Sequence, residues 1–438
     1  MQTGRGISLN RIEIKHTGPL KGEITTPPDK SISHRSVMFA SLATGKSRVE
    51  NFLTAEDPMS TLDAFRQMGV NIETNKQQCT VTINSDGLRA LKPPSIDIDC
   101  GNSGTTMRLM SGVLAGQDFP SVLTGDDSLR LRPMQRIITP LSEMGALINS
   151  ASGKPPLKIT GTSLHPIDYV SPVASAQVKS AIMLAGLYCS GTTTVTEPER
   201  SRDHTERMLK ASGATITVEG LKVSIEGASR LEPFEITVPG DISSAAFFMA
   251  AALIVPGSEI LIKNTGINPT RTGIIDIIRQ MGGTLRLENQ REVSGEPVAD
   301  IYVKYSLLKG ANIGGDVVVK AIDEFPIVCV LAAMAEGTTT IRGAQELRVK
   351  ESDRISTMTM ELRKMGVMIE ELSDGMIIEG RDSLLPALAE SHGDHRVAMS
   401  LAIAGLTVKD ATIINNTGCV NTSFPGFTGL ISSLQGEK

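Results

Sequence analysis

Stretches that are apolar on almost every face recur six times along the 438-residue chain. Each follows a short polar head, and most of them end near a glycine. A helix without a polar face has to be enclosed on all sides, so the pattern predicts six buried helices. The heads begin at Asp29, Asn102, Ser175, Asp241, Asp323 and Asp394, at successive offsets of 73, 73, 66, 82 and 71 residues.

A second, amphipathic helix is predicted after each apolar one. In "NPTRTGIIDIIRQMG", Asn268 is the predicted N-cap and Pro269 the first helical residue. "EDPMSTLDAFRQMG" repeats this pattern with Asp57 and Pro58. A glycine closes each of these helices, which predicts a left-handed C-cap. The closing residues are Gly69, Gly145, Gly213, Gly282 and Gly366, with Gly436 as a degenerate sixth.

Short runs rich in Val, Ile and Thr lie between the helices and predict β-strands, for example "CTVTI" and "GMIIEG". Each repeat is therefore β-α-β-α-β-β, and six repeats form two groups of three. The predicted fold class is α/β (α+β). The predicted domains are residues 24–238 and residues 1–23 plus 239–438, and the N-terminal strand "ISLNRIEIK" is expected to cross over to the second domain.

Composition narrows the class of protein. The net charge of −5 and the 3% aromatic content argue against a nucleic-acid partner. No apolar run has membrane-spanning length, and "MQTGRGISLNR" lacks a signal-peptide core, so no membrane partner is predicted. Five scattered cysteines without a CxxC pair predict neither disulfides nor a zinc site. We expect a cytoplasmic globular protein.

The polar heads predict an anion-binding site. Helix N-termini carry unpaired N–H groups and a partial positive charge, so converging termini attract anions. Basic residues accompany five of the six heads, whereas the fourth, "GDISS", has none and is interpreted as structural. Such recurrence in an acidic protein predicts small polyanionic ligands. The cations concerned are Lys30, Arg35, Arg130, Arg132, Lys179, Arg200, Arg202, Arg348, Lys350, Arg354 and Arg396.

Taken singly, these residues have plainer explanations. Lys350 and Arg354 lie four apart on a predicted helix, where they would normally form a solvated face. Asp29 is interpreted as a helix cap and His34 as a structural residue. HExxH, P-loop, GxGxxG and GxSxG motifs are absent, so we expect acid–base chemistry without a metal or a nucleotide cofactor.

Seven motifs follow one another along nearly the whole chain: "PPDKSISHR", "GNSGTTMR", "RP" at 132–133, "ASAQVKSA", "ELRVKESDR", "GDHR" and "SFP" at 423–425. Together they resemble the motifs of the 5-enolpyruvylshikimate-3-phosphate (EPSP) synthase family, especially its second bacterial class. The resemblance implies the enolpyruvyl transferase fold, an inside-out α/β barrel in two domains around buried parallel helices. It also places the active site in the cleft between the domains.

The resemblance implies a reaction of the shikimate pathway, which leads to chorismate and the aromatic amino acids. The 5-hydroxyl of shikimate 3-phosphate attacks C2 of phosphoenolpyruvate, and the resulting tetrahedral intermediate loses phosphate. No cofactor is implied, and nothing in the sequence requires more than a monomer. Both substrates carry a phosphate and a carboxylate, which gives the cationic cluster a purpose.

Roles for individual residues follow from the same resemblance. Asp323 would accept the 5-hydroxyl proton, Glu351 would transfer a proton at the methylene carbon, and Lys30 would act as an acid. His395 would support them. The shikimate 3-phosphate residues would be Lys30, Ser31, Arg35, Ser175, Ala176, Gln177, Arg202, Asp323 and Lys350. The phosphoenolpyruvate residues, where glyphosate also binds in this family, would be Lys30, Asn102, Gly104, Arg132, Gln177, Arg354 and Arg396.

The sequence departs from the family's first class at two places. Asn421–Ser423 occupies the position of a lysine before "TFP", and Glu346 replaces an asparagine. One alternative is UDP-N-acetylglucosamine enolpyruvyl transferase, which would show an asparagine after Lys30 and a cysteine before Pro133. The chain instead reads Ser31 and "TGDDSLRLRP". Another is a non-catalytic clamp-like repeat scaffold, which would not need the acid–base residues together.

Overall fold

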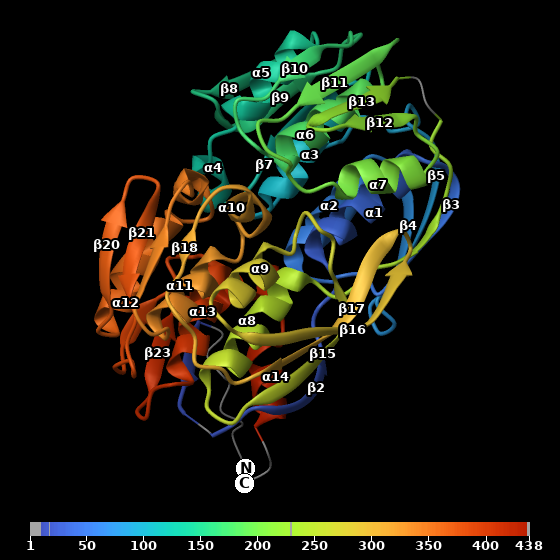
Figure 1. Ribbon diagram of the computed structural model, residues 1–438. Coiled ribbons are helices and arrows are strands. Elements are labelled where there is room, and N and C mark those ends of the chain that lie inside the picture. Colours follow the sequence, from blue (N-terminus) through green and yellow to red (C-terminus); the bar gives the residue numbers. More distant parts are fainter. Residues whose placement is uncertain (1–9, 17, 228–229, 436–438) are drawn as a thin grey trace, which may run out of the picture. The chain divides into compact units, whose positions relative to one another are not determined.

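A computed structural model describes residues 10–16, 18–227 and 230–435 of the chain. These residues divide into two compact units, each with three sheets and three enclosed helices (Figure 1). The first unit comprises Pro27–Pro239 and Arg291–Val298. The second unit comprises the described residues up to Thr26, then Gly240–Gln290 and those from Ala299 onward.

The three sheets of the first unit share one topology. In each sheet the first two strands are parallel and the remaining pairs are antiparallel. This common order confirms three copies of one repeat. The sheets are β14 (Glu235–Thr237), β3 (Thr44–Glu50), β5 (Thr80–Asp86), β4 (Asn71–Asn75); β6 (Ile98–Asp99), β7 (Pro120–Thr124), β9 (Lys154–Thr160), β8 (Leu147–Ala151); and β10 (Asp168–Val170), β11 (Thr192–Thr196), β13 (Lys222–Glu226), β12 (Ile216–Glu219).

The second unit also has three sheets, but its last sheet has three strands instead of four. The predicted crossover of the N-terminal strand is confirmed, because β1 pairs antiparallel with β23 in the last sheet, with Arg11 opposite Asn415. The sheets are β2 (Lys21–Thr25), β15 (Glu259–Gly266), β17 (Glu296–Lys304), β16 (Thr284–Val293); β18 (Asn312–Ile313), β19 (Thr338–Ile341), β21 (Gly375–Glu379), β20 (Met368–Leu372); and β22 (Leu388–Glu390), β23 (Thr412–Asn415), β1 (Arg11–Ile14).

Two strands pair in a different unit from the apolar helix that follows them in sequence. β2 precedes the first apolar helix but pairs in parallel with β15 of the second unit. β14 precedes the fourth apolar helix but pairs in parallel with β3 of the first unit. The chain therefore passes from one unit to the other at Thr26–Pro27 and at Pro239–Gly240, and also on either side of Arg291–Val298.

Three apolar helices form the interior of the first unit: α1 (Lys30–Leu42), α3 (Gly104–Ala115) and α6 (Ala176–Gly186). From the second turn onward their side chains are buried on every face, as the sequence pattern predicts. α3 and α6 approach so closely that a Cβ at Gly112 would overlap the carbonyl of Ala181. Only glycine permits this contact.

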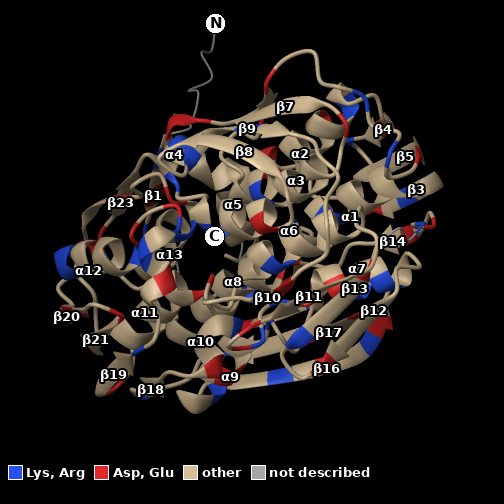
Figure 2. Cartoon of the chain, turned by 90° about the horizontal axis from the view of Figure 1, so that it is seen from above, with Lys and Arg blue, Asp and Glu red and all other residues tan. Residues whose placement is uncertain are grey.

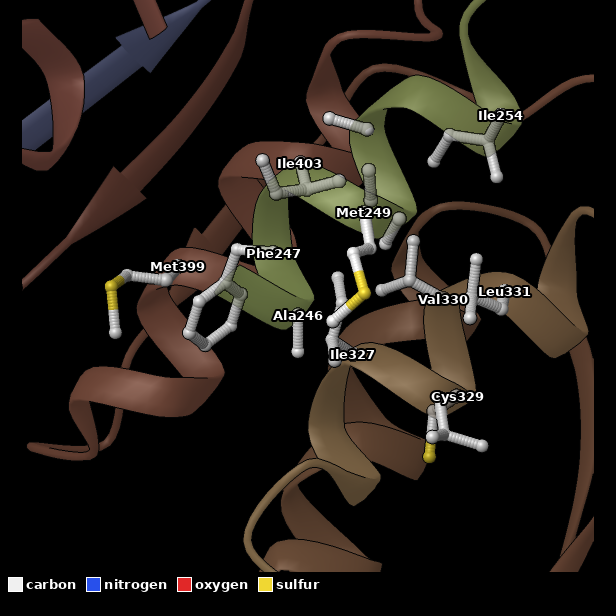
Figure 3. Close-up of a cluster of buried hydrophobic side chains, with 14 of the residues drawn as sticks. Ala246, Phe247, Met249, Ile254, Ile327, Cys329, Val330, Leu331, Met399 and Ile403 are labelled. Carbon is white, nitrogen blue, oxygen red and sulfur yellow. The ribbon is translucent and has the colours of Figure 1, made fainter. Parts of the chain in front are cut away.

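The interior of the second unit is built in the same way from α8 (Ile242–Ile254), α11 (Phe325–Ala333) and α13 (His395–Gly405). Figure 3 shows their side chains packed together, with Met249 of α8 between Phe247 and the residues of α11. α8 and α11 carry no charged residue, and they are tan throughout in Figure 2. Charged residues colour outer strands such as β16 and β17.

The remaining helices are shorter or amphipathic and lie outside the apolar ones. The five predicted closing glycines from Gly69 to Gly366 all have a positive φ, which confirms the left-handed C-caps, while Gly436 lies outside the described residues. None of the described helices is long and apolar enough to span a membrane. The elements are α2 (Glu56–Gln67), α4 (Asp127–Leu131), α5 (Gln135–Glu143), α7 (His204–Ala211), α9 (Gly273–Gln280), α10 (Asp316–Lys320), η1 (Gln345–Val349), α12 (Arg354–Lys364), η2 (Thr417–Thr422) and α14 (Phe427–Leu434).

Two predicted helix starts are wrong. α9 begins at Gly273 rather than at Pro269, because Asn268 uses its side chain to hold a turn through the backbone N–H of Thr270 at 2.9 Å. α2 begins at Glu56 after Ala55, so Asp57 is an interior residue of the first turn instead of its cap. In both cases the side chain serves another contact.

Candidate active site

The N-terminal halves of α1, α3 and α6 meet in the first unit. Arg35 of α1 is 3% exposed and connects α1 and α6 to α7. Its Nη2 donates to Ser180 Oγ at 3.0 Å, and its Nε donates to Thr205 Oγ1 at 2.7 Å. The remaining Nη1 donates to the carbonyl of Ser31 at 3.1 Å. Arg35 therefore fixes the first turn of α1 next to α6.

Lys30 is the first residue of α1, and its ammonium is held in place. Its Nζ lies 2.9 Å from Asp57 Oδ2 on α2, with 18% of its side chain exposed. Asp29 accepts a hydrogen bond from the backbone N–H of Ile32 at 2.8 Å, which confirms that it caps the helix. Asp57, which the sequence suggested as a cap, is instead the partner that orients Lys30.

His34 is enclosed behind these charged groups and is structural, as expected from the sequence. It is fully buried, and its Nδ1 lies 2.7 Å from Thr61 Oγ1. Burial, reinforced by the positive charges of Lys30 and Arg35, lowers the pKa of His34 well below its usual value. The ring is therefore neutral in the folded chain.

Acidification is expected to destabilise the first unit through His34. Below about pH 6.5 the unfolded chain gains a proton at this residue that the folded chain cannot take, so stability falls by about 1.4 kcal/mol per pH unit until the folded pKa is reached. Urea unfolding of wild type and His34→Asn, measured at pH 7.5 and pH 5.5, should show a shallower pH dependence in the variant. His165→Asn, at an exposed histidine of the same unit, is the control. Equal pH slopes in wild type and His34→Asn would contradict this assignment.

A layer of guanidinium and amide groups surrounds the start of α3. Arg132 Nη2 donates to Asn102 Oδ1 at 2.6 Å, and Arg108 Nη1 donates to Gln177 Oε1 at 2.5 Å. A Cβ at Gly104 would lie 3.0 Å from Arg108 Nη1 and 3.3 Å from Arg132 Nη1. Glycine at position 104 thus leaves room for two guanidinium groups beside a helix N-terminus.

Ser175 caps α6, and a hydrogen bond to Glu197 fixes the backbone of Ser175. Its Oγ accepts from the N–H of Val178 at 3.4 Å, while its N–H donates to Glu197 Oε1 at 3.2 Å. Ala176 is the first residue of α6, and Arg202 lies half-buried in the segment before α7. The first unit therefore assembles most of the predicted anion-binding residues at its helix N-termini.

The second unit gathers the predicted acid–base residues around one carboxylate. Asp323 lies beside the start of α11, with 18% of its side chain exposed. Three cations surround it: Lys350 Nζ at 3.8 Å, Arg354 Nη1 at 3.6 Å and Arg396 Nη2 at 3.8 Å. Three positive charges around a carboxylate favour its ionised form. Such a group can accept a proton.

Arg354 is the most deeply buried of these cations, with 1% of its side chain exposed. Its Nε donates to Asp394 Oδ2 at 2.8 Å, and its Nη2 donates to Glu351 Oε2 at 2.7 Å. Although burial alone would raise the pKa of Asp394, the charge of Arg354 holds that pKa below its usual value. The pair is therefore ionised, and it fixes the carboxylate of Glu351 near Asp323.

Sequence reasoning missed a buried arginine at the fourth head. Arg271 is 2% exposed, and its Nη2 donates to Ser243 Oγ at 2.7 Å and lies 3.2 Å from Asp241 Oδ1. Ser243 also donates to Glu324, the residue next to Asp323. "GDISS" therefore does have a cation, supplied by the segment before α9. The signal was the "TRT" run, which the sequence analysis assigned to a helix.

Some predicted cations serve other purposes, and one expected helix does not form. Lys350 ends η1 while Arg354 begins α12, so the two residues do not share a helix. Arg348 pairs with Asp353 and Glu371, which holds η1 against β20. Arg130 donates to Thr124, and Arg200 donates to the carbonyl of Gly220. Arg108 was missed because its partner Gln177 is 69 residues away in sequence.

The described residues hold no group of three or more His, Cys, Asp or Glu side chains that could bind a metal ion. His395, the first residue of α13, is 4% exposed and follows Asp394 in the cap of that helix. The charged groups assembled in the two units are carboxylates, lysines and arginines. They suit proton transfer at a substrate that carries several negative charges.

Comparison with known proteins agrees with this geometry. Residues 14–430 match the family model of EPSP synthase (3-phosphoshikimate 1-carboxyvinyltransferase). The 3-phosphoshikimate 1-carboxyvinyltransferase of Geotalea daltonii is 57% identical over 417 residues, which cover 95% of this chain and 97% of that protein. That of Thermodesulfovibrio yellowstonii is 54% identical over 98% of this chain and 100% of that protein.

Solved structures of the same family also match this chain over nearly its whole length. The structure of EPSP synthase from Acinetobacter baumannii superposes with a TM-score of 0.86 at 50% identity, covering 97% of this chain and 98% of that one. The family model, the similar sequences and the similar solved structure all point to one family. This chain belongs to the EPSP synthase family of 3-phosphoshikimate 1-carboxyvinyltransferases.

Proposed function

We propose that the chain transfers the enolpyruvyl group of phosphoenolpyruvate to the 5-hydroxyl of shikimate 3-phosphate and releases phosphate. The observation that carries this proposal is the Asp323 carboxylate within 3.8 Å of three cations. A base of this kind suits removal of a hydroxyl proton beside anionic substrates. We place the reaction in a cleft between the predicted domains, residues 24–238 and residues 1–23 with 239–438.

Shikimate 3-phosphate is assigned to the N-termini of α1 and α6. In this assignment its phosphate binds Ser175, the backbone of Ala176, and Arg202, where the free N–H groups of α6 favour an anion. Ser31 and Arg35 hold its carboxylate side. Gln177 packs against the ring, and Lys350 and Asp323 approach the 5-hydroxyl.

Phosphoenolpyruvate is assigned to the guanidinium groups. Arg132, Arg354 and Arg396 would clamp its phosphate and carboxylate, because a guanidinium fork matches both anions. Asn102 and Gly104 line this side, where the hydrogen bond from Arg132 to Asn102 already orients one fork. Lys30, held by Asp57, would contact both substrates.

The proposed chemistry balances in two steps. In the first, the 5-hydroxyl oxygen bonds to C2 of phosphoenolpyruvate, Asp323 takes the hydroxyl proton, and C3 gains a proton from the protonated Glu351. The product is a tetrahedral intermediate. In the second, Glu351 takes a proton back from C3 while the C2–O bond to phosphate breaks, with Lys30 as the acid toward the leaving group. His395 supports this arrangement through its place beside Asp394.

No cofactor is needed in this scheme, and every residue in it comes from one chain. We therefore propose a monomer that acts in the cytoplasm, with phosphoenolpyruvate and shikimate 3-phosphate as its ligands. Nucleic acid and membrane are not partners in this proposal.

A phosphate-release assay tests the proposal. The folded chain should release inorganic phosphate from phosphoenolpyruvate in the presence of shikimate 3-phosphate, and not when UDP-N-acetylglucosamine replaces it. The two acceptors share the same donor chemistry, so the comparison isolates acceptor choice. A folded chain that is inactive with shikimate 3-phosphate, or that prefers the nucleotide sugar, would overturn the assignment.

A further inference from the structure

A buried charge cluster behind α6 has one carboxylate too many. Lys179 is 1% exposed, and its ammonium lies 2.7 Å from Glu197 Oε2 and 2.6 Å from Glu206 Oε1. Glu197 also accepts hydrogen bonds from the backbone N–H groups of Ser175 and Ser201, so both of its oxygens are used. One ammonium therefore faces two carboxylates.

The excess negative charge of this cluster is assigned to Glu206. This residue is 5% exposed, and its Oε2 has no hydrogen-bond partner among the described residues. A buried acceptor without a partner is energetically unfavourable, and a bound donor would remove that cost. Glu206 lies on α7 and is one of the residues that line a cavity, so the unpartnered oxygen belongs to a side chain of the cavity wall.

The cavity measures about 320 Å³, at the lower end of the range for small-molecule sites. α7 and the segment before it form its polar wall, and β12 and β13 with the turn between them form the other wall. Two aliphatic side chains of that wall, Val218 and Leu221, are 48% and 41% exposed. The aliphatic lining is Ile216, Val218, Leu221 and Val223.

Positive charge is available at the rim of the cavity. Arg200 and Lys210 both line it, and neither has a carboxylate partner within 4.0 Å in the described part of the chain. Arg207, by contrast, is paired with Asp203 at 2.9 Å. The cavity thus presents an unpaired buried acceptor, two uncompensated cations and an aliphatic wall.

We propose that this cavity binds a free α-amino acid with an apolar side chain. The ammonium group donates to Glu206 Oε2 and balances the second carboxylate of the cluster. The carboxylate of the ligand binds Arg200 and Lys210, and its side chain covers the aliphatic wall. A ligand of this class satisfies all three features at once, and its small size fits the volume.

Simpler ligands satisfy only part of the lining. An inorganic anion would bind the rim cations but leave Glu206 without a donor beside the negative cluster. An amine would pair with Glu206 but leave Arg200 and Lys210 uncompensated. A neutral apolar molecule would cover only the aliphatic wall.

Isothermal titration of the full chain with three probes separates these cases. L-Leucine carries all three groups, L-leucinamide lacks the carboxylate, and 4-methylpentanoate lacks the ammonium. We expect leucine to bind at least tenfold more tightly than either analogue, and to bind equally well when phosphoenolpyruvate and shikimate 3-phosphate are present. No heat of binding with leucine, equal affinity of an analogue, or displacement by those substrates would overturn the proposal.

Variants test the individual contacts. Glu206→Gln should lower leucine affinity at least tenfold and still fold, because Lys179 keeps Glu197 as a balanced partner. Arg200→Ala, at an exposed position, should lower leucine affinity severalfold without touching the buried cluster. Lys222→Ala removes an exposed cation of β13 that does not line the cavity, and it should leave affinity unchanged. Unchanged affinity in both Glu206→Gln and Arg200→Ala would contradict the site.

Discussion

Asp323→Asn is expected to lower kcat by about a thousandfold, the scale of a general base in proton transfer. Three cations lie within 3.8 Å of the carboxylate, and only the ionised acid can take the hydroxyl proton. An amide of the same shape keeps the packing but cannot act as a base. Steady-state phosphate release should show this loss in kcat, with a much smaller change in KM for shikimate 3-phosphate.

The matched control is Asp316→Asn on α10, where an exposed aspartate forms an ion pair with Lys320. Both variants should have the same melting temperature as wild type within a few degrees. If Asp323→Asn retained more than a tenth of the wild-type kcat, Asp323 would not be the base.

Arg354→Met is expected to destabilise the second unit by about 3–5 kcal/mol, the cost of leaving one partner of a buried ion pair uncompensated. The carboxylate of Asp394 is fully buried and receives two hydrogen bonds from Arg354. The same substitution removes the partner of Glu351, so activity should also be lost. Urea unfolding at pH 7 measures the first effect.

A double variant distinguishes charge from packing. Arg354→Met combined with Asp394→Asn removes the orphaned charge and should recover part of the lost stability, whereas a pure packing defect would not recover. Arg363 on the same helix is exposed and donates to the carbonyl of Ile369, so Arg363→Met should cost about 1 kcal/mol or less. Equal losses for Arg354→Met and Arg363→Met would contradict the ionised pair.

The pH dependence of this pair has a defined sign. Because Arg354 lowers the pKa of Asp394 in the folded chain, the pair stabilises the chain fully above the ordinary aspartate pKa near 3.9. That contribution falls as the pH drops below this value toward the folded pKa. His34 acts in the same direction at higher pH, so acid weakens each unit by a separate group.

Much of the fold follows from periodicity. The six apolar stretches became α1, α3, α6, α8, α11 and α13, because a helix without a polar face can only be enclosed. The left-handed glycines from Gly69 to Gly366 ended the helices before them, because few other residues adopt that backbone. Helix enclosure and glycine C-caps depend on residues that are close together in the sequence, so the hydrophobic pattern is enough to predict them.

Helix starts were less predictable. Asn268 and Asp57 are both good capping residues, yet neither caps a helix. Asn268 holds a local turn, and Asp57 orients the ammonium of Lys30, 27 residues earlier. A capping side chain competes with every other donor that the fold brings near it, and the sequence does not show which donor wins.

By itself the sequence determined the repeats, the enclosed helices and the residue types at their heads, because each depends on short-range periodicity. Only the tertiary structure decided the partners: Arg108 with Gln177, Arg271 with Ser243, and Lys179 with Glu206. It also decided that β2, which precedes α1 in sequence, pairs with β15. Charged groups interact through space, so residues far apart in the chain can hold one another, and no local pattern records which of them meet.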